Sequence, residues 1–125
     1  MKSKLDNLIN QLKNAFERFQ DVMRQKENEY IRDSAIQRFE FTFELAWKTM
    51  KAYLDEKGAK DLQFPRDVIR SAYQARIIEN DPKWLDMIET RNQTSHIYNE
   101  NMAEKVYKQL PAYIPLFQKL INELT

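Results

Sequence analysis

Apolar residues recur along the chain at steps of three and four, the spacing that places side chains on one face of an α-helix. The first such run starts near Ser3 and reaches about Arg24, and a polar stretch from Gln25 to Asn28 follows it. The pattern predicts an amphipathic helix with one face in a core. Its apolar positions are Leu5, Leu8, Ile9, Leu12, Ala15, Phe16, Phe19, Val22 and Met23.

A longer helix is predicted from about Tyr30 to Lys57, ending at Gly58, because glycine readily adopts the left-handed conformation that closes many helices. Phe41, Leu45 and Tyr53 lie off its main apolar stripe, so its apolar surface is wider than one neighbour covers. We expect this helix to contact a second partner, such as another subunit. The main stripe consists of Ile36, Phe39, Phe43, Ala46 or Trp47, Met50 and Leu54.

Prolines mark the remaining helices. Pro65 suits the first turn of a helix that would run to about Ile78, and Asp81-Pro82 would open a short helix directly before residue 91. A last amphipathic stretch starts near Asn99 and is kinked or divided by Pro111 and Pro115. The residues expected to point inward are Val68, Ile69, Ala72, Tyr73, Trp84, Leu85, Met87, Ile88, Leu116, Phe117, Leu120, Ile121 and Leu124.

The composition agrees with an all-α fold. The 125 residues include one glycine and four prolines, whereas an all-β chain needs a turn signal about every 8–12 residues. Hydrophobic residues make up 42% of the chain, enough for one core, and the length suits one domain over residues 1–125. We therefore predict an antiparallel four-helix bundle with a short additional helix.

The charge and residue usage narrow the function. A formal net charge of +1 argues against a general nucleic-acid coat protein, but it leaves room for a local phosphate site. The absence of cysteine excludes disulfides and thiolate metal sites and fits a reducing compartment. No apolar leader or membrane-length run is present, so we expect a soluble cytoplasmic protein that does not bind a membrane.

The segment around the single histidine holds the candidate chemistry. Arg91, His96 and Tyr98 form the pattern R-x-x-x-x-H-x-Y. Arginine presents a permanently charged fork that matches phosphate oxygens, and histidine exchanges protons near neutral pH. RNA carries its own nucleophile, the 2′-hydroxyl. A base and a cation are therefore the minimum for metal-free RNA cleavage.

The same spacing also occurs on ordinary helical surfaces, and on spacing alone that structural interpretation is favoured. One histidine cannot be both general base and general acid. A catalytic role therefore predicts a symmetric dimer, in which two copies of Arg91 and His96 meet.

Other polar pairs point less clearly to a site. Glu40 and Glu44 share a helical face but have no histidine neighbour, so solvated side chains are favoured over a metal site. Arg66 and Arg70 also share a face and could add RNA phosphate contacts, although a solvated face is again favoured. The chain has no glycine-rich phosphate loop, no zinc-ligand spacing and no metal site that the sequence indicates.

Three separated blocks of the chain resemble one family. Residues 39–48 (FEFTFELAWK), 65–70 (PRDVIR) and 84–100 (WLDMIETRNQTSHIYNE) occur in the same order as in the nucleotidyltransferase substrate-binding protein family, a branch of the HEPN superfamily. The likeness extends from about Ser3 to Leu124. Phe64 departs from the family pattern, in which a capping residue such as serine would be more typical before Pro65. This departure puts a helix start in question.

The resemblance implies a HEPN-like bundle that forms homodimers and pairs with a small nucleotidyltransferase (MNT). Members with the full motif are similar to ribonuclease toxins of type VII-like HEPN–MNT toxin–antitoxin modules, which cut RNA, here tRNA or mRNA, without a metal. This implies Arg91 and His96 as catalytic residues, and no DNA substrate. The implied supporting residues are Asn92, Thr94 and Ser95. The partner would silence the toxin by AMPylation of Tyr98, and the ATP and Mg²⁺ for that step belong to the partner, so this chain binds no cofactor.

Two alternatives remain open. The chain could be a non-catalytic binding subunit that presents substrate to the nucleotidyltransferase, or a purely structural dimeric bundle. A complete set of Arg91, His96 and Tyr98 favours the ribonuclease, because a binding subunit needs neither a proton carrier nor a phenol there. The small net charge favours the binding subunit, because RNA affinity would have to be local or shared with the partner.

Overall fold

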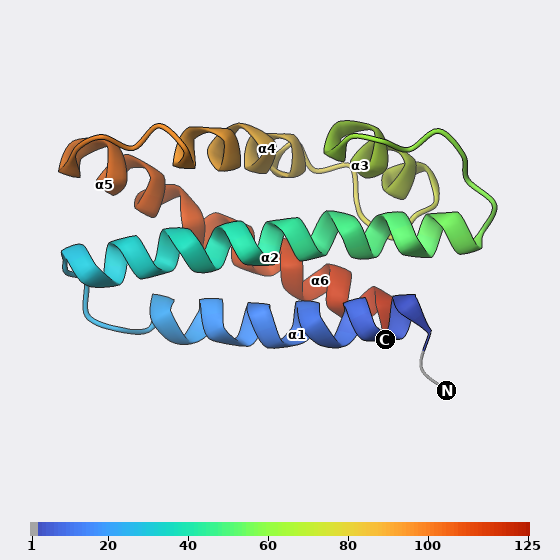
Figure 1. Cartoon of the computed structure of the whole chain (residues 1–125), viewed down its shortest axis with the longest axis horizontal. Coiled ribbons are helices and arrows are strands. Elements are labelled where there is room, and N and C mark those ends of the chain that lie inside the picture. The colour runs from blue at the N-terminus through green and yellow to red at the C-terminus, as the bar shows by residue number, and fades with distance from the viewer. Residues whose placement is uncertain (1–2) are drawn as a thin grey trace.

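All regular structure in residues 3–125, which the computed structural model describes, is helical. The elements are α1 (Lys4–Met23), α2 (Glu29–Glu56), α3 (Pro65–Gln74), α4 (Lys83–Thr94), α5 (Glu100–Gln109), a 3-10 turn η1 (Leu110–Tyr113) and α6 (Ile114–Leu124). Figure 1 shows α1 and α2 as long antiparallel rods, with α3 and α4 following one another along α2 and α6 crossing behind it. The predicted helical bundle is confirmed.

Side chains fix the starts of the two long helices. Ser3 accepts a hydrogen bond from the backbone of Asp6, whose carboxylate accepts one from the Ser3 backbone, so the two residues form a capping box. Asn28 caps α2 by accepting from the backbone N–H of Ile31 at 2.9 Å. Phe64 precedes α3 without a side-chain cap, and Pro65 still starts the helix there, because its fixed φ suits a first turn.

The ends of α2 and α3 share one backbone motif. Gly58 follows α2 with φ +92°, and two hydrogen bonds from residues 58 and 59 back to Asp55 and Leu54 close the helix. Arg76 follows α3 with φ +64° and closes it in the same way. The predicted end of α2 at Gly58 is confirmed, whereas α3 ends at Gln74 and not near Ile78 as expected.

The core is built around aromatic rings from several helices. The Phe39 ring centroid lies 6.2 Å from that of Phe19 on α1, 5.5 Å from Tyr113 in η1 and 6.4 Å from Phe117 on α6. Such tilted and offset contacts are favourable for aromatic rings in a packed interior. Trp84 on α4 joins this cluster through an edge contact with Phe117.

Most of the expected inward positions are buried, Ile88 and Leu124 are half-buried, and two are exposed. Tyr73 and Leu85 are 45% and 39% exposed, so their expected place in the core is wrong. Ile77 and Ile78 are buried although they lie beyond the end of α3. Phe41 on α2 is 46% exposed, and the second partner expected at this off-stripe surface stays a prediction.

The prolines near the C-terminus divide the last amphipathic stretch. α5 ends at Gln109, the 3-10 turn contains Pro111, and Pro115 lies in the first turn of α6. Because proline lacks the N–H that an unbroken helix uses, the division takes place here. Within residues 3–125, no helix combines the length and the apolar character needed to cross a membrane.

Candidate functional site

The R-x-x-x-x-H-x-Y segment spans the end of one helix and the start of the next. Residues 91–94 form the last turn of α4, Ser95 follows as its C-cap, and Asn99 caps α5 by accepting from the backbone N–H of Met102 at 3.0 Å. Residues 96–98 form the link between the two helices. α4 is therefore longer than the short helix expected, and it carries the arginine on a rigid element while the histidine and tyrosine lie beyond its end.

A chain of hydrogen-bonded side chains, centred on the buried Thr90, fixes this end of α4. Thr90 is 1% exposed and donates its hydroxyl hydrogen to Gln109 Oε1 at 2.8 Å. Its oxygen lies 2.8 Å from the Tyr113 hydroxyl, which donates the remaining hydrogen bond, because the single Thr90 hydrogen is already used. Burial raises the pKa of Tyr113, and the hydrogen bond with Thr90 opposes that rise in part. The residue before Arg91 is thus tied to α5 and η1.

His96 and Tyr98 contact one another in the link. The His96 Nδ1 atom lies 3.1 Å from the Tyr98 hydroxyl oxygen, and the His96 backbone donates to the backbone oxygen of Gln93 at 2.9 Å. Tyr98 is 77% exposed, so its oxygen is open to a reagent from solution. When Nδ1 carries the hydrogen and donates it to Tyr98, Nε2 is left without a hydrogen and can accept a proton.

Arg91 faces α2. Its Nε lies 2.9 Å from Oε1 of Glu44, which is ion-pair distance, but the N–H does not point at the oxygen, so no aligned hydrogen bond forms. The second Glu44 oxygen accepts from Trp47 Nε1 at 3.2 Å. The sequence interpretation of Glu44 as a solvated carboxylate is therefore wrong, because its side chain is 31% exposed and holds Arg91.

A groove of about 480 Å³ opens beside His96, between the end of α4 and α5. Its volume falls within the range of about 300–1,000 Å³ common for small-molecule sites. Apolar side chains and two amides line it together with one acid and one lysine, so it offers both packing and hydrogen bonds. The lining residues are Glu89, Asn92, Gln93, His96, Ile97, Met102, Lys105 and Val106.

The supporting residues take different places. Asn92 lines the groove, whereas the Thr94 hydroxyl donates to the backbone oxygen of Arg91 at 2.6 Å and stiffens the last turn of α4. Ser95 is exposed at the C-cap. Arg66 and Arg70 are exposed on α3, and Figure 1 shows α3 and α5 at opposite ends of the molecule. One chain does not bring these arginines to the groove, and their phosphate contacts stay a prediction.

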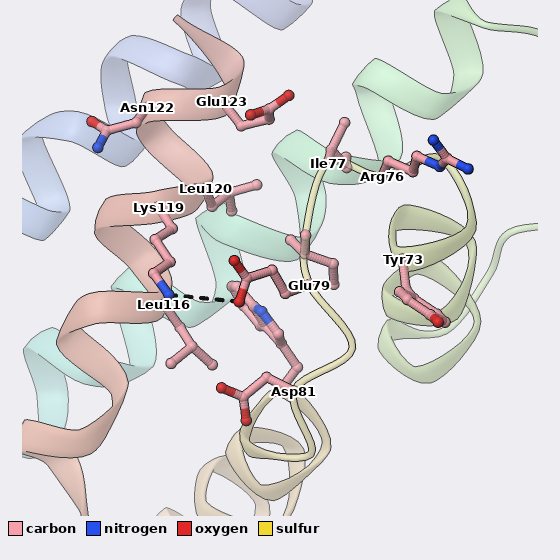
Figure 2. A pocket seen from close by; sticks show the side chains of 12 residues that line it. Tyr73, Arg76, Ile77, Glu79, Asp81, Leu116, Lys119, Leu120, Asn122 and Glu123 are labelled. Carbon is pink, nitrogen blue, oxygen red and sulfur yellow. Dashed lines mark ion pairs between the residues drawn. The ribbon is translucent and has the colours of Figure 1, made fainter.

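A second hollow, of about 580 Å³, lies between the α3–α4 connection and α6 (Figure 2). Lys119 and Glu79 form an exposed ion pair at 3.6 Å across it, and none of the candidate catalytic residues lines it. Within residues 3–125, no three His, Asp or Glu side chains gather in a way that could hold a metal ion.

Comparisons with known proteins agree on the family. Residues 3–125 match the family model described as "Nucleotidyltransferase substrate binding protein like". The chain is 34% identical over 97 residues to a Haemophilus influenzae protein named probable ribonuclease HepT. That match covers 72% of this chain, and the chain spans only 64% of the relative's length.

Two solved structures share the fold. A Thermus thermophilus protein has a TM-score of 0.82 at 33% identity, with 90% of this chain and 98% of that chain covered. A Haemophilus influenzae structure described as revealing the fold of a substrate binding domain of a nucleotidyltransferase has a TM-score of 0.81 at 26% identity, with 93% and 98% covered. The helical bundle, the site segment and the family match over residues 3–125 lead to one conclusion: this chain belongs to the family of nucleotidyltransferase substrate-binding proteins.

Proposed function

We propose that this chain is a metal-independent ribonuclease of the HEPN type, the toxin of a toxin–antitoxin module whose partner nucleotidyltransferase silences it at Tyr98. The observation that carries the proposal is the contact between His96 Nδ1 and the Tyr98 hydroxyl, at 3.1 Å, beside a groove of about 480 Å³. The relative named probable ribonuclease HepT supports the same activity.

His96 acts as the general base. With Nδ1–H donated to Tyr98, the free Nε2 takes the proton of an RNA 2′-hydroxyl, and that oxygen attacks the adjacent phosphorus. The bond from phosphorus to the 5′-oxygen breaks, which leaves a 2′,3′-cyclic phosphate and a 5′-hydroxyl end. Arg91 stabilises the negative charge that builds up on the phosphate oxygens.

The leaving 5′-oxygen needs a proton from a second group. The chain has one histidine, so we assign the general acid to His96 of a second copy, and the active unit is a homodimer. Two copies also double the number of arginines at the phosphate. This raises the local positive charge without a basic protein surface, which fits the net charge of +1.

Silencing follows from the exposure of Tyr98. The phenol oxygen attacks the α-phosphorus of ATP held by the partner enzyme, pyrophosphate leaves, and AMP stays on the tyrosine. The new phosphodiester is negative and bulky and lies beside His96, so it excludes the RNA phosphate by sterics and repulsion. With partner, ATP and Mg²⁺, we expect mass increments of AMP on wild type and on Tyr30→Phe, which removes an equally exposed tyrosine, but not on Tyr98→Phe.

A second candidate is a non-catalytic binding subunit of a two-component nucleotidyltransferase. The Haemophilus influenzae structure described as a nucleotidyltransferase substrate binding domain favours it. The end groups of the products separate the two functions. The ribonuclease cuts RNA in EDTA to 2′,3′-cyclic phosphate ends and leaves DNA of the same sequence intact. Uncut RNA, or 3′-hydroxyl products, would count against the ribonuclease.

A further inference from the structure

Glu44 is shared between two side chains that differ in chemistry. One oxygen lies 2.9 Å from Nε of Arg91 on α4, and the other accepts from the indole N–H of Trp47 at 3.2 Å. Trp47 lies three residues further along α2, on the same face of the helix. The tryptophan therefore fixes the rotamer of the carboxylate, and the carboxylate faces the arginine.

The Nε atom and the terminal nitrogens of the Arg91 guanidinium lie in different surroundings. Nε is shielded from solvent and turned towards α2, while the side chain as a whole is 37% exposed. A guanidinium has five N–H groups in a rigid fork, and four of them belong to the terminal nitrogens. The ion pair with Glu44 and the burial of Nε hold this edge of the fork against α2 and leave the terminal N–H groups for a ligand.

We propose that Glu44, itself fixed by Trp47, is a positioning residue that aims the Arg91 fork at the phosphate. The consequence for catalysis rests on the proposed ribonuclease function, whereas the anchoring of Arg91 does not. A long, freely rotating arginine would lose conformational entropy each time it bound a phosphate. An arginine that is already oriented pays this cost in folding, and misplacement of such a group by about 1 Å can cost on the order of 100-fold in rate.

The first experiment follows the Arg91 Nε–H by NMR and does not depend on RNA cleavage. Glu44→Ala opens Nε to water, so we expect its hydrogen exchange to become much faster than in wild type. Glu44→Gln keeps the shape but removes the carboxylate charge that pairs with Arg91, so we expect a smaller rise in exchange, and this variant serves if Glu44→Ala does not fold. Glu40→Ala, one turn earlier on the same helix, is the matched control and leaves the exchange unchanged. Equal exchange in wild type and both Glu44 variants overturns the anchoring.

The second experiment measures RNA cleavage. We expect Glu44→Ala to lower kcat by about 10–100-fold with little change in KM, and Glu40→Ala to leave both unchanged. Lysine has no Nε–H, so Glu44→Ala costs little in an Arg91→Lys background if Glu44 acts through Arg91. An equal loss in both backgrounds overturns the positioning role. A wild type that cuts no RNA overturns the proposed function, while the exchange experiment still decides whether Glu44 anchors Arg91.

Discussion

Three threonines are buried in the part of the chain that the structure describes, and they differ in what their hydroxyls hold together. Thr42 and Thr49 donate to backbone oxygens of α2 itself, at Arg38 and Leu45, and Thr49 also lies 3.4 Å from the Leu8 backbone oxygen of α1. Thr90 instead joins side chains of α5 and η1 to α4. The first two bonds add to a helix that is already formed, whereas the third fixes how helices meet next to Arg91.

Replacing Thr90 by valine should therefore be costly. The change keeps the volume but leaves the buried Tyr113 hydroxyl without its partner, which we expect to cost about 1–3 kcal/mol in the free energy of unfolding. Thr42→Val is the matched control. It removes a hydroxyl of similar burial whose partner carbonyl keeps its place in the helix, so its cost should be smaller. Urea denaturation measures both, and equal losses would contradict the bridging role of Thr90.

Tyr113 also predicts a pH dependence. Burial raises its pKa above the ordinary value of 10, so the folded protein favours the neutral phenol. The corresponding stabilisation is complete below about pH 10 and is lost as the pH rises through the folded-state pKa. We expect the free energy of unfolding of wild type to fall more steeply above about pH 10 than that of Tyr113→Phe. Parallel profiles in chemical denaturation would show that Tyr113 does not titrate with the fold.

Single residues were predictable where they carry distinctive chemistry. Arg91, His96 and Tyr98 could be singled out because their types and spacing are chemical in themselves. Glu44 could not, because its partner is 47 residues away along the chain and a lone glutamate on a helix is normally solvated. The spacing of three residues between Glu44 and Trp47 is compatible with a hydrogen bond between them on one helix face. It points to Arg91 only when α4 is known to lie against α2.

Among the helices, the ends of α2 at Gly58 and of α3 at Arg76 have the same backbone motif, but only the first could be predicted from the sequence. The motif at Gly58 was predictable, because glycine adopts positive φ without strain. Arg76 also has a positive φ, which an arginine side chain disfavours. The sequence therefore does not indicate a helix end there, and α3 was expected to continue. Ile77 and Ile78 contribute to that error. They are apolar because they are buried beyond the helix end, and in the sequence they look like a continuation of the helical apolar face.

Arg76→Gly should stabilise the protein. Relief of the left-handed strain, about 1–2 kcal/mol, exceeds the entropy that glycine adds to the unfolded chain, about 0.4–1 kcal/mol. The expected net gain is about 0.5–1 kcal/mol in the free energy of unfolding. Ala75→Gly is the control one residue earlier, where φ is −81°, and it should destabilise. Destabilisation by Arg76→Gly would mean that the arginine side chain contributes more than its backbone costs.

At the scale of the whole molecule, the bundle was predictable and the site was predictable only in part. Helical periodicity and sparse glycine indicate the fold, because burial of one apolar face per helix leaves few arrangements. The groove at His96 depends on how α4 and α5 meet, and no local pattern encodes that. The second copy of the chain is part of the proposal, because a single histidine cannot be both the general base and the general acid.

The proposed dimer makes a quantitative prediction for mixed subunits. If each cut needs two His96 side chains, equal amounts of wild type and His96→Ala that exchange freely leave about a quarter of the dimers active. The cleavage rate per wild-type chain then falls to about half. Mixing with Glu40→Ala, which keeps the histidine, leaves it unchanged. An unchanged rate per wild-type chain after verified exchange with His96→Ala would contradict the shared site.

The proposed reaction is RNA cleavage by Arg91 and His96 without a metal. Its most direct measurement is the initial rate of RNA cleavage in EDTA by wild type, Arg91→Ala and His96→Ala, each checked for an unchanged helical content. We expect cleavage by wild type and a loss of about 100-fold or more in each variant, because His96 supplies the proton transfer and Arg91 the charge stabilisation. Equal rates for wild type and His96→Ala would contradict it.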